Sequence, residues 1–425
     1  MNSVRPLFVI TNNGIKSPIT LFFMQYDFIF AGGGMSALLV AHLIKSEKAL
    51  ADCTMLIVDP NLVSPQSKNI CFWADHLPAL PLTLKGKWDS LSFAGQKGVK
   101  TRLIDPLSYY CFDAASLLTQ LRNELSAAGG VTFVEDRVAR MDETRVELRN
   151  SGVVYAARQY IFDSLPPKEV SVPLWQHFLG WEIETNQNSG LDTQALTLMD
   201  FRVDQSQGPA FMYVLPFSPR KILVEITLMS SALLSIEHYE AYIRDYLRTH
   251  LPKLDFTLRH TEQGKIPMHQ VRHGAESLGP IKLGIKGGMT KPTTGYTFLN
   301  SYRQAQKITA QLLAGSRLDS QPTPSKRFVF YDRLLLNIIR TNPEAVKPIM
   351  ESLFHRNRYD TLLAFLSERS TLLQEAGLFW SLPWKPFLTA LYHEYFGGAQ
   401  RDETQSRADR PVLHPARLES EWLVE

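Results

Sequence analysis

The residues best suited by type and spacing to bind a ligand form a glycine-rich turn near the N-terminus. Gly32, Gly34 and Ala37 fit the pattern G-x-G-x-x-[GA], between an apolar run and a helical pattern. In a dinucleotide-binding βαβ unit these positions permit the tight turn, the approach of a pyrophosphate, and close packing of the helix on the sheet. Asp59 ends the next apolar run, where a carboxylate accepts hydrogen bonds from ribose hydroxyls. The pattern predicts an adenine dinucleotide site, with an ordinary glycine turn as the alternative.

A second glycine turn lies far along the chain. Gly287 and Gly288 follow a short apolar run, and Thr293, Thr294 and Gly295 precede or begin a predicted helix over 295–315. The free N–H groups at a helix N-terminus favour a phosphate or a flavin ring. The first motif alone does not distinguish FAD from NAD. Two such turns so far apart in the sequence favour FAD, because it is the longer ligand.

Composition narrows the class of protein. The 425 residues are 44% hydrophobic and 20% charged, as in a globular protein long enough for two domains. A net charge of +3 is close to neutral for a chain of this length and does not indicate a basic surface for nucleic acid, so no nucleic-acid partner is expected. Three cysteines without CxxC spacing favour a reducing compartment over a disulfide frame, and no metal site is predicted. No transmembrane helix or signal peptide is expected, and residues 1–23 are expected to form a disordered N-terminal extension.

The predicted elements divide the remaining chain into three parts with an α/β (α+β) organisation. Residues 24–165 and 260–315 are expected to form a discontinuous, Rossmann-like cofactor-binding domain. Within it, the aromatic segment 68–73 is expected to be a loop. Short aromatic and β-branched runs in 166–259 are typical of an antiparallel sheet, which is assigned to the substrate domain. Residues 316–425 are expected to be a C-terminal helical region.

A series of motifs between residues 24 and 310 occurs in an order that is more specific than any single motif. The matching segments are 32–34, 71–73, 110–114, 162–167, 175–184, 199–202, 223–227, 266–268 and 287–298. Together they resemble the FAD-dependent lycopene cyclases of the β-cyclase type. The resemblance implies a flavoprotein fold of the p-hydroxybenzoate-hydroxylase type. It also implies closure of the linear ends of lycopene into β-ionone rings, giving β-carotene via γ-carotene without net oxidation.

Glu225 is the first candidate catalytic residue. Cyclising an isoprenoid end requires a proton on the terminal double bond and removal of a proton from the new ring, and burial raises the pKa of a carboxylic acid toward that task. Glu225 matches the first glutamate of the family's F-L-E-E-T motif, in which Ile226 replaces the second acid here. This departure weakens any scheme with paired carboxylates at that position. The alternative is a strand glutamate that faces solvent.

Other residues are candidates for supporting roles. Asp200 and Arg202 are predicted to orient the acid or the flavin, with an ion pair between them as the equal alternative, because side chains two apart on a strand share a face. The aromatic residues predicted to stabilise a cation in the substrate pocket, or else to belong to the core, are Trp73, Trp181, Phe201 and Tyr213. His177 and Glu182 are weaker candidates.

The resemblance also implies cofactors and partners. FAD is expected to act in its reduced form, with NADPH or NADH as reductant, because an electron-rich flavin stabilises nearby positive charge. Lycopene dissolves in a bilayer, so a cytoplasmic protein docked peripherally on the membrane surface is expected, and other carotenoid enzymes are candidate partners. Residues 379–388 combine Trp, Phe and Lys, which suits an interfacial segment or a core helix pair equally.

Two other functions remain open from the sequence. An FAD-dependent hydroxylase or a geranylgeranyl-reductase-like oxidoreductase would use the same fold. A flavin- or carotenoid-binding protein without catalysis is the alternative of another class. The mass of the product distinguishes them, because a hydroxylase adds oxygen, a reductase adds hydrogen, and a cyclase leaves the mass unchanged.

Overall fold

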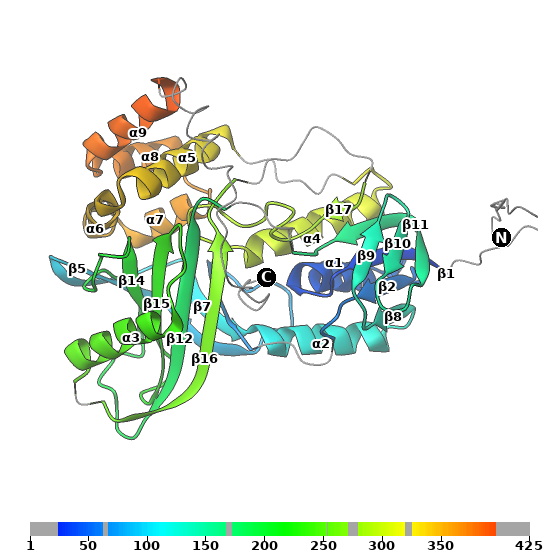
Figure 1. Ribbon diagram of the computed structural model, residues 1–425, viewed down its shortest axis with the longest axis horizontal. Helices are drawn as coiled ribbons and strands as arrows, with labels where there is room; N and C mark the ends of the chain where they lie inside the picture. The colour runs from blue at the N-terminus through cyan, green and yellow to red at the C-terminus, as the bar shows by residue number, and fades with distance from the viewer. Residues whose placement is uncertain are drawn as a thin grey trace, which may run out of the picture.

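The computed structural model describes residues 24–62, 67–166, 172–252, 254–270, 279–318 and 325–396. The expected N-terminal extension, Pro167 of the matching motifs and the tail from Gly397 lie outside these ranges. Within them the chain forms three sheets and several helices, with the first sheet at one end of the molecule and the C-terminal helices at the other (Figure 1).

The first sheet carries the glycine turn. Its strands run in the order β8 (Val131–Val134), β2 (Met55–Val58), β1 (Met24–Ala31), β11 (Val154–Asp163), β10 (Arg145–Leu148) and β9 (Val138–Met141), and β17 (Ile281–Lys282) also pairs with β11. Phe28 to Ala31 of β1 are fully buried, as expected for a central parallel strand covered on both faces. The helices α1 (Met35–Ser46), α2 (Ala114–Ala127) and α4 (Phe298–Leu313) pack together over the face that carries Phe28 and Phe30.

The second sheet is antiparallel except for one pair of strands. Its order is β16 (Phe256–Pro267), β12 (Trp175–Thr185), β15 (Lys221–Ser230), β14 (Ala210–Pro216), β13 (Ala195–Asp200), β5 (Ser90–Gly95) and β6 (Gly98–Leu103), with β13 and β5 parallel. Helix α3 (Ile236–His250) covers one face of this sheet (Figure 1). The antiparallel sheet was predicted, but β5 and β6 join it from within the range 24–165, and part of β16 joins it from beyond residue 259.

A third, three-stranded sheet joins the other two. It consists of β3 (Asn69–Ala74), β7 (Ser108–Asp113) and β4 (Leu84–Trp88), in that order. The prediction of a loop at 68–73 is therefore wrong for most of that segment. Asn69 to Ala74 pair with β7 along their whole length, and this long-range pairing gives an aromatic segment a strand conformation.

In residues 325–396, the described part of the C-terminal region, the chain forms five α-helices, and the sequence predicts a helical region there. They are α5 (Lys326–Thr341), α6 (Val346–Arg356), α7 (Tyr359–Leu366), α8 (Leu372–Trp380) and α9 (Trp384–Phe396). They share one apolar core with the second and third sheets, and in it the rings of Phe93 and Phe354 stack 4.6 Å apart. In the part of the chain that the structure describes, no helix has the length and apolar character needed to cross a membrane.

Candidate active site

A large apolar cavity lies where the second sheet, the third sheet and the C-terminal helices meet. Its empty space, which includes the opening to solvent, measures about 1620 Å³, and it is lined on the sheet side by Trp73, Tyr109, Tyr213 and Glu225. On the helix side it is lined by Met350, Leu353, Phe354, Leu362, Phe365 and Leu366. Of the predicted pocket residues, Trp73 and Tyr213 therefore lie at the cavity. The contribution of α6 and α7 was not predicted.

Strand β15 places Glu225 in the cavity wall. Leu223, Glu225 and Thr227 alternate with apolar residues that face α3, so the carboxyl group points into the cavity and not into bulk solvent. The hydroxyl of Thr227 donates a hydrogen bond to Glu225 Oε1 at 3.0 Å. Burial raises the pKa of Glu225 well above its usual 4.5, and the nearby Glu262 raises it further. Such a carboxyl group holds a proton at pH values where an exposed glutamate has lost it.

Glu262 is a second acid in the cavity that the sequence analysis missed. Strand β12 lies between β15 and β16, and its Gly180 is paired with Glu225 on one side and Glu262 on the other. A methyl group on Gly180 would lie 3.2 Å from Glu262 Cγ and 3.4 Å from Glu225 Cβ. Gly180 was visible as a glycine inside a predicted strand, which often marks a close approach.

Glu262 is held by one neutral residue. The backbone N–H of Asn69 donates to Glu262 Oε2 at 2.8 Å, and its side-chain Nδ2 donates to Oε1 at 2.9 Å. Asn69 Nδ2 also donates to Glu182, which forms an ion pair with Lys85. Glu182 thus belongs to a polar network behind the cavity. Burial raises the pKa of Glu262, and the hydrogen bonds from Asn69 oppose that rise.

Three tyrosine hydroxyls form a chain in the cavity wall. Tyr213 donates to Tyr109 at 2.9 Å, and the hydroxyls of Tyr109 and Tyr296 lie 3.0 Å apart. The rings of Trp73 and Tyr296 pack edge to face, with their centroids 4.1 Å apart. Burial raises the pKa of Tyr109 and Tyr213 well above 10, so the phenols stay neutral. The wall therefore presents aromatic faces and neutral hydroxyls to a ligand.

Four predicted site residues lie away from the cavity. Asp200 and Arg202 form the ion pair named as the alternative, with Arg202 Nη2 2.7 Å from Asp200 Oδ2, and Tyr246 of α3 donates to the same carboxylate at 2.9 Å. Trp181 packs on the α3 face beneath the guanidinium of Arg244, and Phe201 lies in the core beside Phe93. His177, another weaker candidate, is buried and bonded to Tyr239 and Ser230.

The N-terminal glycine turn has the conformation that its motif requires. Gly32 has φ +98°, and a Cβ there would lie 2.4 Å from Ser164 Oγ, so only glycine fits. Gly34 is the N-cap of α1, and Ala37 is fully buried on that helix. Asp59 accepts a hydrogen bond from the Gly33 backbone N–H at 2.8 Å, which fixes its carboxylate at the turn.

A small cleft joins the two predicted cofactor-binding turns. Its empty space, which includes the opening to solvent, measures about 410 Å³, and it is lined by Gly34 and Ser36, by 164–166, and by 283–286 before the late glycines. Gly287 and Gly288 do not line it, whereas Thr293, Thr294 and Gly295 line the large cavity. Ser36 and Thr297 line both spaces. A long ligand lying in the cleft would therefore reach the cavity, and the α1 N-terminus suits its phosphates.

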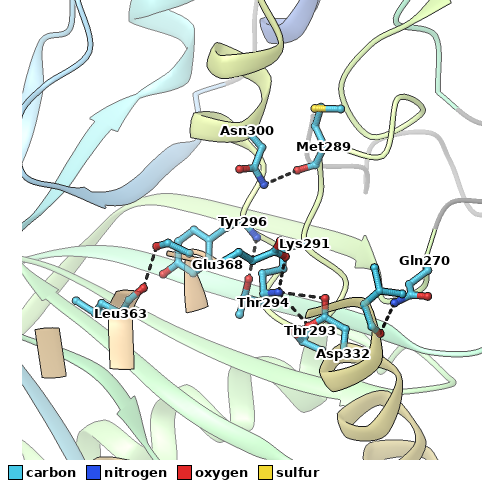
Figure 2. Close-up of polar contacts among 12 residues, drawn as sticks. Gln270, Met289, Lys291, Thr293, Thr294, Tyr296, Asn300, Asp332, Leu363 and Glu368 are labelled. Atoms are coloured by element: carbon cyan, nitrogen blue, oxygen red, sulfur yellow. Dashed lines mark hydrogen bonds and ion pairs between the residues drawn. The ribbon is translucent and has the colours of Figure 1, made fainter. Parts of the chain in front are cut away.

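The loop between the late turn and α4 is fixed by a buried charge cluster. Figure 2 shows Lys291 between Asp332 of α5 and Glu368, with Nζ–O distances of 3.0 Å and 2.9 Å. Thr293 donates to the same Asp332 carboxylate at 2.8 Å. Lys291 and Asp332 are less than 10% exposed. This cluster connects the loop that lines the cavity to the C-terminal helices.

The fold and the cavity together define the class of protein: a Rossmann-like, FAD-binding-type flavoprotein fold with an acid in an apolar cavity. The chain belongs to the lycopene cyclase protein family, whose family model matches residues 27–392. It is 26% identical to lycopene beta-cyclase of Pantoea ananas over 305 residues, which is 67% of this chain and 74% of that protein. It is 25% identical to lycopene beta-cyclase of Paracoccus sp. over 295 residues, covering 64% and 70%. The predicted family and the prediction of an enzyme of this type are confirmed.

Solved structures confirm the predicted fold class. A geranylgeranyl bacteriochlorophyll reductase-like protein from Thermoplasma acidophilum superposes with a TM-score of 0.54 at 13% identity, over 90% of this chain and all of that chain. A flavoprotein/dehydrogenase from Cytophaga hutchinsonii gives a TM-score of 0.50 at 12% identity, over 83% and 98%. At these identities the likeness establishes the fold and says nothing about the reaction.

Proposed function

We propose that this enzyme closes the linear ends of lycopene into β-ionone rings by acid catalysis without net oxidation, giving β-carotene via γ-carotene. The observation that carries the proposal is the position of Glu225 in the wall of an apolar, aromatic cavity, with its pKa raised well above 4.5. Family membership and the names of the two relatives support the substrate and the ring type.

The chemistry follows from the side chains at the cavity. Glu225 donates its proton to the terminal double bond, the neighbouring alkene attacks the resulting cation, and the new ring then returns a proton to the Glu225 carboxylate, so atoms and electrons balance. The apolar wall excludes water that would otherwise trap the cation. The rings of Trp73, Tyr213 and Tyr296 line the same space and are suited to stabilise positive charge through their faces. Asp200 and Arg202 have no part in this scheme.

We infer that the cleft at the N-terminus of α1 is where the phosphates of FAD bind. Gly32, Gly34 and the α1 N-terminus would hold its phosphates, and residues 284–286 would line the opposite side of the cleft. When bound in reduced form, FAD would supply electron density that stabilises a nearby cation. The reduced state, and NADPH or NADH as electron donor, belong to the proposal through the family resemblance.

Membrane docking is part of the proposal because lycopene is found in bilayers. Large apolar side chains are exposed on α8, α9 and the turn between them, and Leu373, Trp380 and Trp384 are 86%, 92% and 65% exposed. Tryptophan is favoured at the bilayer interface. Of the two interpretations of residues 379–388, this exposure supports the interfacial one.

Expression in bacteria that accumulate lycopene tests the proposal, with pigments separated by chromatography and weighed by mass spectrometry. A cyclic product of unchanged mass that is lost in Glu225→Ala is the expected result, with a fall of about 10²-fold or more. A product with added oxygen or hydrogen would instead identify a hydroxylase or a reductase. Unchanged lycopene with flavin bound to the protein would favour a binding protein without catalysis.

A further inference from the structure

The two acids of the cavity differ in the groups that surround them. Both oxygens of Glu262 accept hydrogen bonds from Asn69, an arrangement that matches a carboxylate, because an ionised carboxyl group only accepts. In the part of the chain that the structure describes, Glu262 has no ion-pair partner, since Lys85 pairs with Glu182. Glu225 accepts one hydrogen bond, at Oε1 from Thr227. The surroundings therefore favour the charged form at Glu262 and the protonated form at Glu225.

The missing side chain at Gly180 brings the two acids into one space. Strands β15 and β16 are not paired with each other, because β12 lies between them in the sheet. Any side chain on residue 180 would stand between Glu225 and Glu262, as the short distances from a methyl group at Gly180 show. Two like charges in one buried site oppose each other, so one of the two groups keeps its proton.

From this geometry we propose that Glu262 is a positioning residue that acts through Glu225: its carboxylate, facing Glu225 across Gly180, keeps Glu225 protonated and ready to donate. For its catalytic consequence the inference rests on the proposed function. Glu262 replaces, from a distant strand, the second acid that the Leu223–Thr227 motif lacks. After Glu225 has donated its proton, repulsion from Glu262 favours its reprotonation, which resets the site for the next ring.

Other titratable groups lie near Glu225 and Glu262 on several neighbouring elements. Tyr213 of β14 and Tyr296 face Glu225 from two sides, and Cys71 and Cys111 come from the third sheet. Lys85 and Glu182 lie near Glu262, and His260 lies near Glu182. The tyrosines and Cys111 have raised pKa values and stay neutral near neutral pH. Lys85 and Glu182 offset each other, which leaves Glu262 as the charge that acts on Glu225.

Infrared titration of the purified full-length protein tests the inference without relying on activity. The band of the protonated carboxyl group that disappears in Glu225→Gln reports Glu225. In Glu262→Gln its titration is expected to move to lower pH by about 1 to 3 pH units, the usual effect of removing one nearby like charge. Glu262→Asp should restore the titration toward that of the parent protein. Glu184→Gln is the matched control. Glu184 lies on β12, the strand that carries Gly180, and pairs with Arg259 at the surface, so this change should leave the titration of Glu225 unchanged.

The pH profile of lycopene cyclisation gives the second measurement. Glu225 must be protonated to act. In Glu262→Gln the high-pH limb of the profile should therefore move to lower pH, by the same number of pH units as the infrared titration, while activity at low pH is retained. Asn69→Ala removes the side-chain hydrogen bond to Glu262 Oε1 and keeps the backbone bond to Oε2, so it should move both readouts in the same direction by a smaller amount. Asn69→Ala tests the inference in place of Glu262→Gln if Glu262→Gln does not fold.

The outcomes separate this inference from the proposed function. A shifted infrared titration together with no conversion of lycopene would support the coupling of the two acids and overturn the proposed reaction. Conversion of lycopene with the same titration and pH profile in Glu262→Gln as in the parent protein would support the reaction and overturn the inference. A uniform loss of activity at every pH, without a shift, would also overturn it, because that is what a merely structural role predicts.

Discussion

Glu225 links the stability of the fold to pH. Its pKa is raised above 4.5 by burial and by Glu262, so between 4.5 and the raised value the folded protein holds a proton that the unfolded chain has lost. Proton binding is then greater in the native state, and the free energy of unfolding falls as pH rises through this window, by about 1.4 kcal/mol for each pH unit that the window spans. Urea unfolding at several pH values should show a smaller fall in Glu225→Gln. An equal slope in both proteins would contradict a raised pKa at Glu225.

A substitution at Gly180 is expected to change the positions of the two acids, Glu225 and Glu262. Gly180→Ala places a methyl group 3.1 Å to 3.4 Å from Leu223, Glu262 and Glu225, which is tighter than ordinary contact and forces the two acids apart. The expected result is a loss of about 1 to 3 kcal/mol of stability, typical of overpacking, and reduced cyclisation. Gly190→Ala, at an exposed loop glycine with open space around it, is a control that loses stability without crowding the acids, because its φ of +77° is unfavourable for alanine. Loss of stability without loss of cyclisation would argue against a need for this spacing.

Among the elements, the loop before α4 depends on Lys291 for its attachment to the C-terminal helices (Figure 2). Lys291→Met would leave the buried Asp332 carboxylate without its cation, and breaking a buried pair in this way costs about 3 to 5 kcal/mol. Burial already raises the pKa of Asp332 despite Lys291, so protonation of Asp332 would recover part of that loss. Lys87→Met removes an exposed partner 3.5 Å from Asp89 and should cost about 0 to 1 kcal/mol. Chemical unfolding of the two variants checks the difference, and equal losses would contradict it.

Local patterns predicted the elements better than they predicted which face each residue occupies. Short aromatic and β-branched runs predicted the antiparallel sheet, and the glycine pattern predicted the turn at Gly32. Residue type does not say which face of a strand a side chain occupies, so Trp181 was assigned to the pocket although its position on β12 faces α3. Glu262 could not be identified, because its pairing with Gly180 depends on the register between distant strands. The strand at Asn69 was missed for the same reason.

At the scale of the whole molecule, the exposed apolar side chains of α8 and α9 lie in the same region as the cavity. Helices α8 and α9 lie on the outer side of the C-terminal region (Figure 1), and α6 and α7 of that region line the cavity. The first sheet lies at the other end, whereas the predicted cofactor cleft adjoins the cavity, since Ser36 and Thr297 line both. A bilayer in contact with α8 and α9 would therefore adjoin the part of the protein that holds the cavity.

Removing the exposed apolar side chains should separate membrane docking from the chemistry. Each large side chain contributes up to about 1.5 to 3 kcal/mol when buried, so Leu373→Ser, Trp380→Ser and Trp384→Ser together should weaken vesicle binding by at least about tenfold. Flotation of the full-length protein with phosphatidylcholine vesicles measures it. Val99→Ser with Leu103→Ser, on the exposed faces of β6, changes 57% and 69% exposed side chains elsewhere and should leave binding intact. The triple variant should bind flavin normally, because α8 and α9 do not line the cofactor cleft. It should convert vesicle-borne lycopene more slowly, because it binds the vesicles more weakly. Equal flotation of both variants would place the docking surface elsewhere on the molecule.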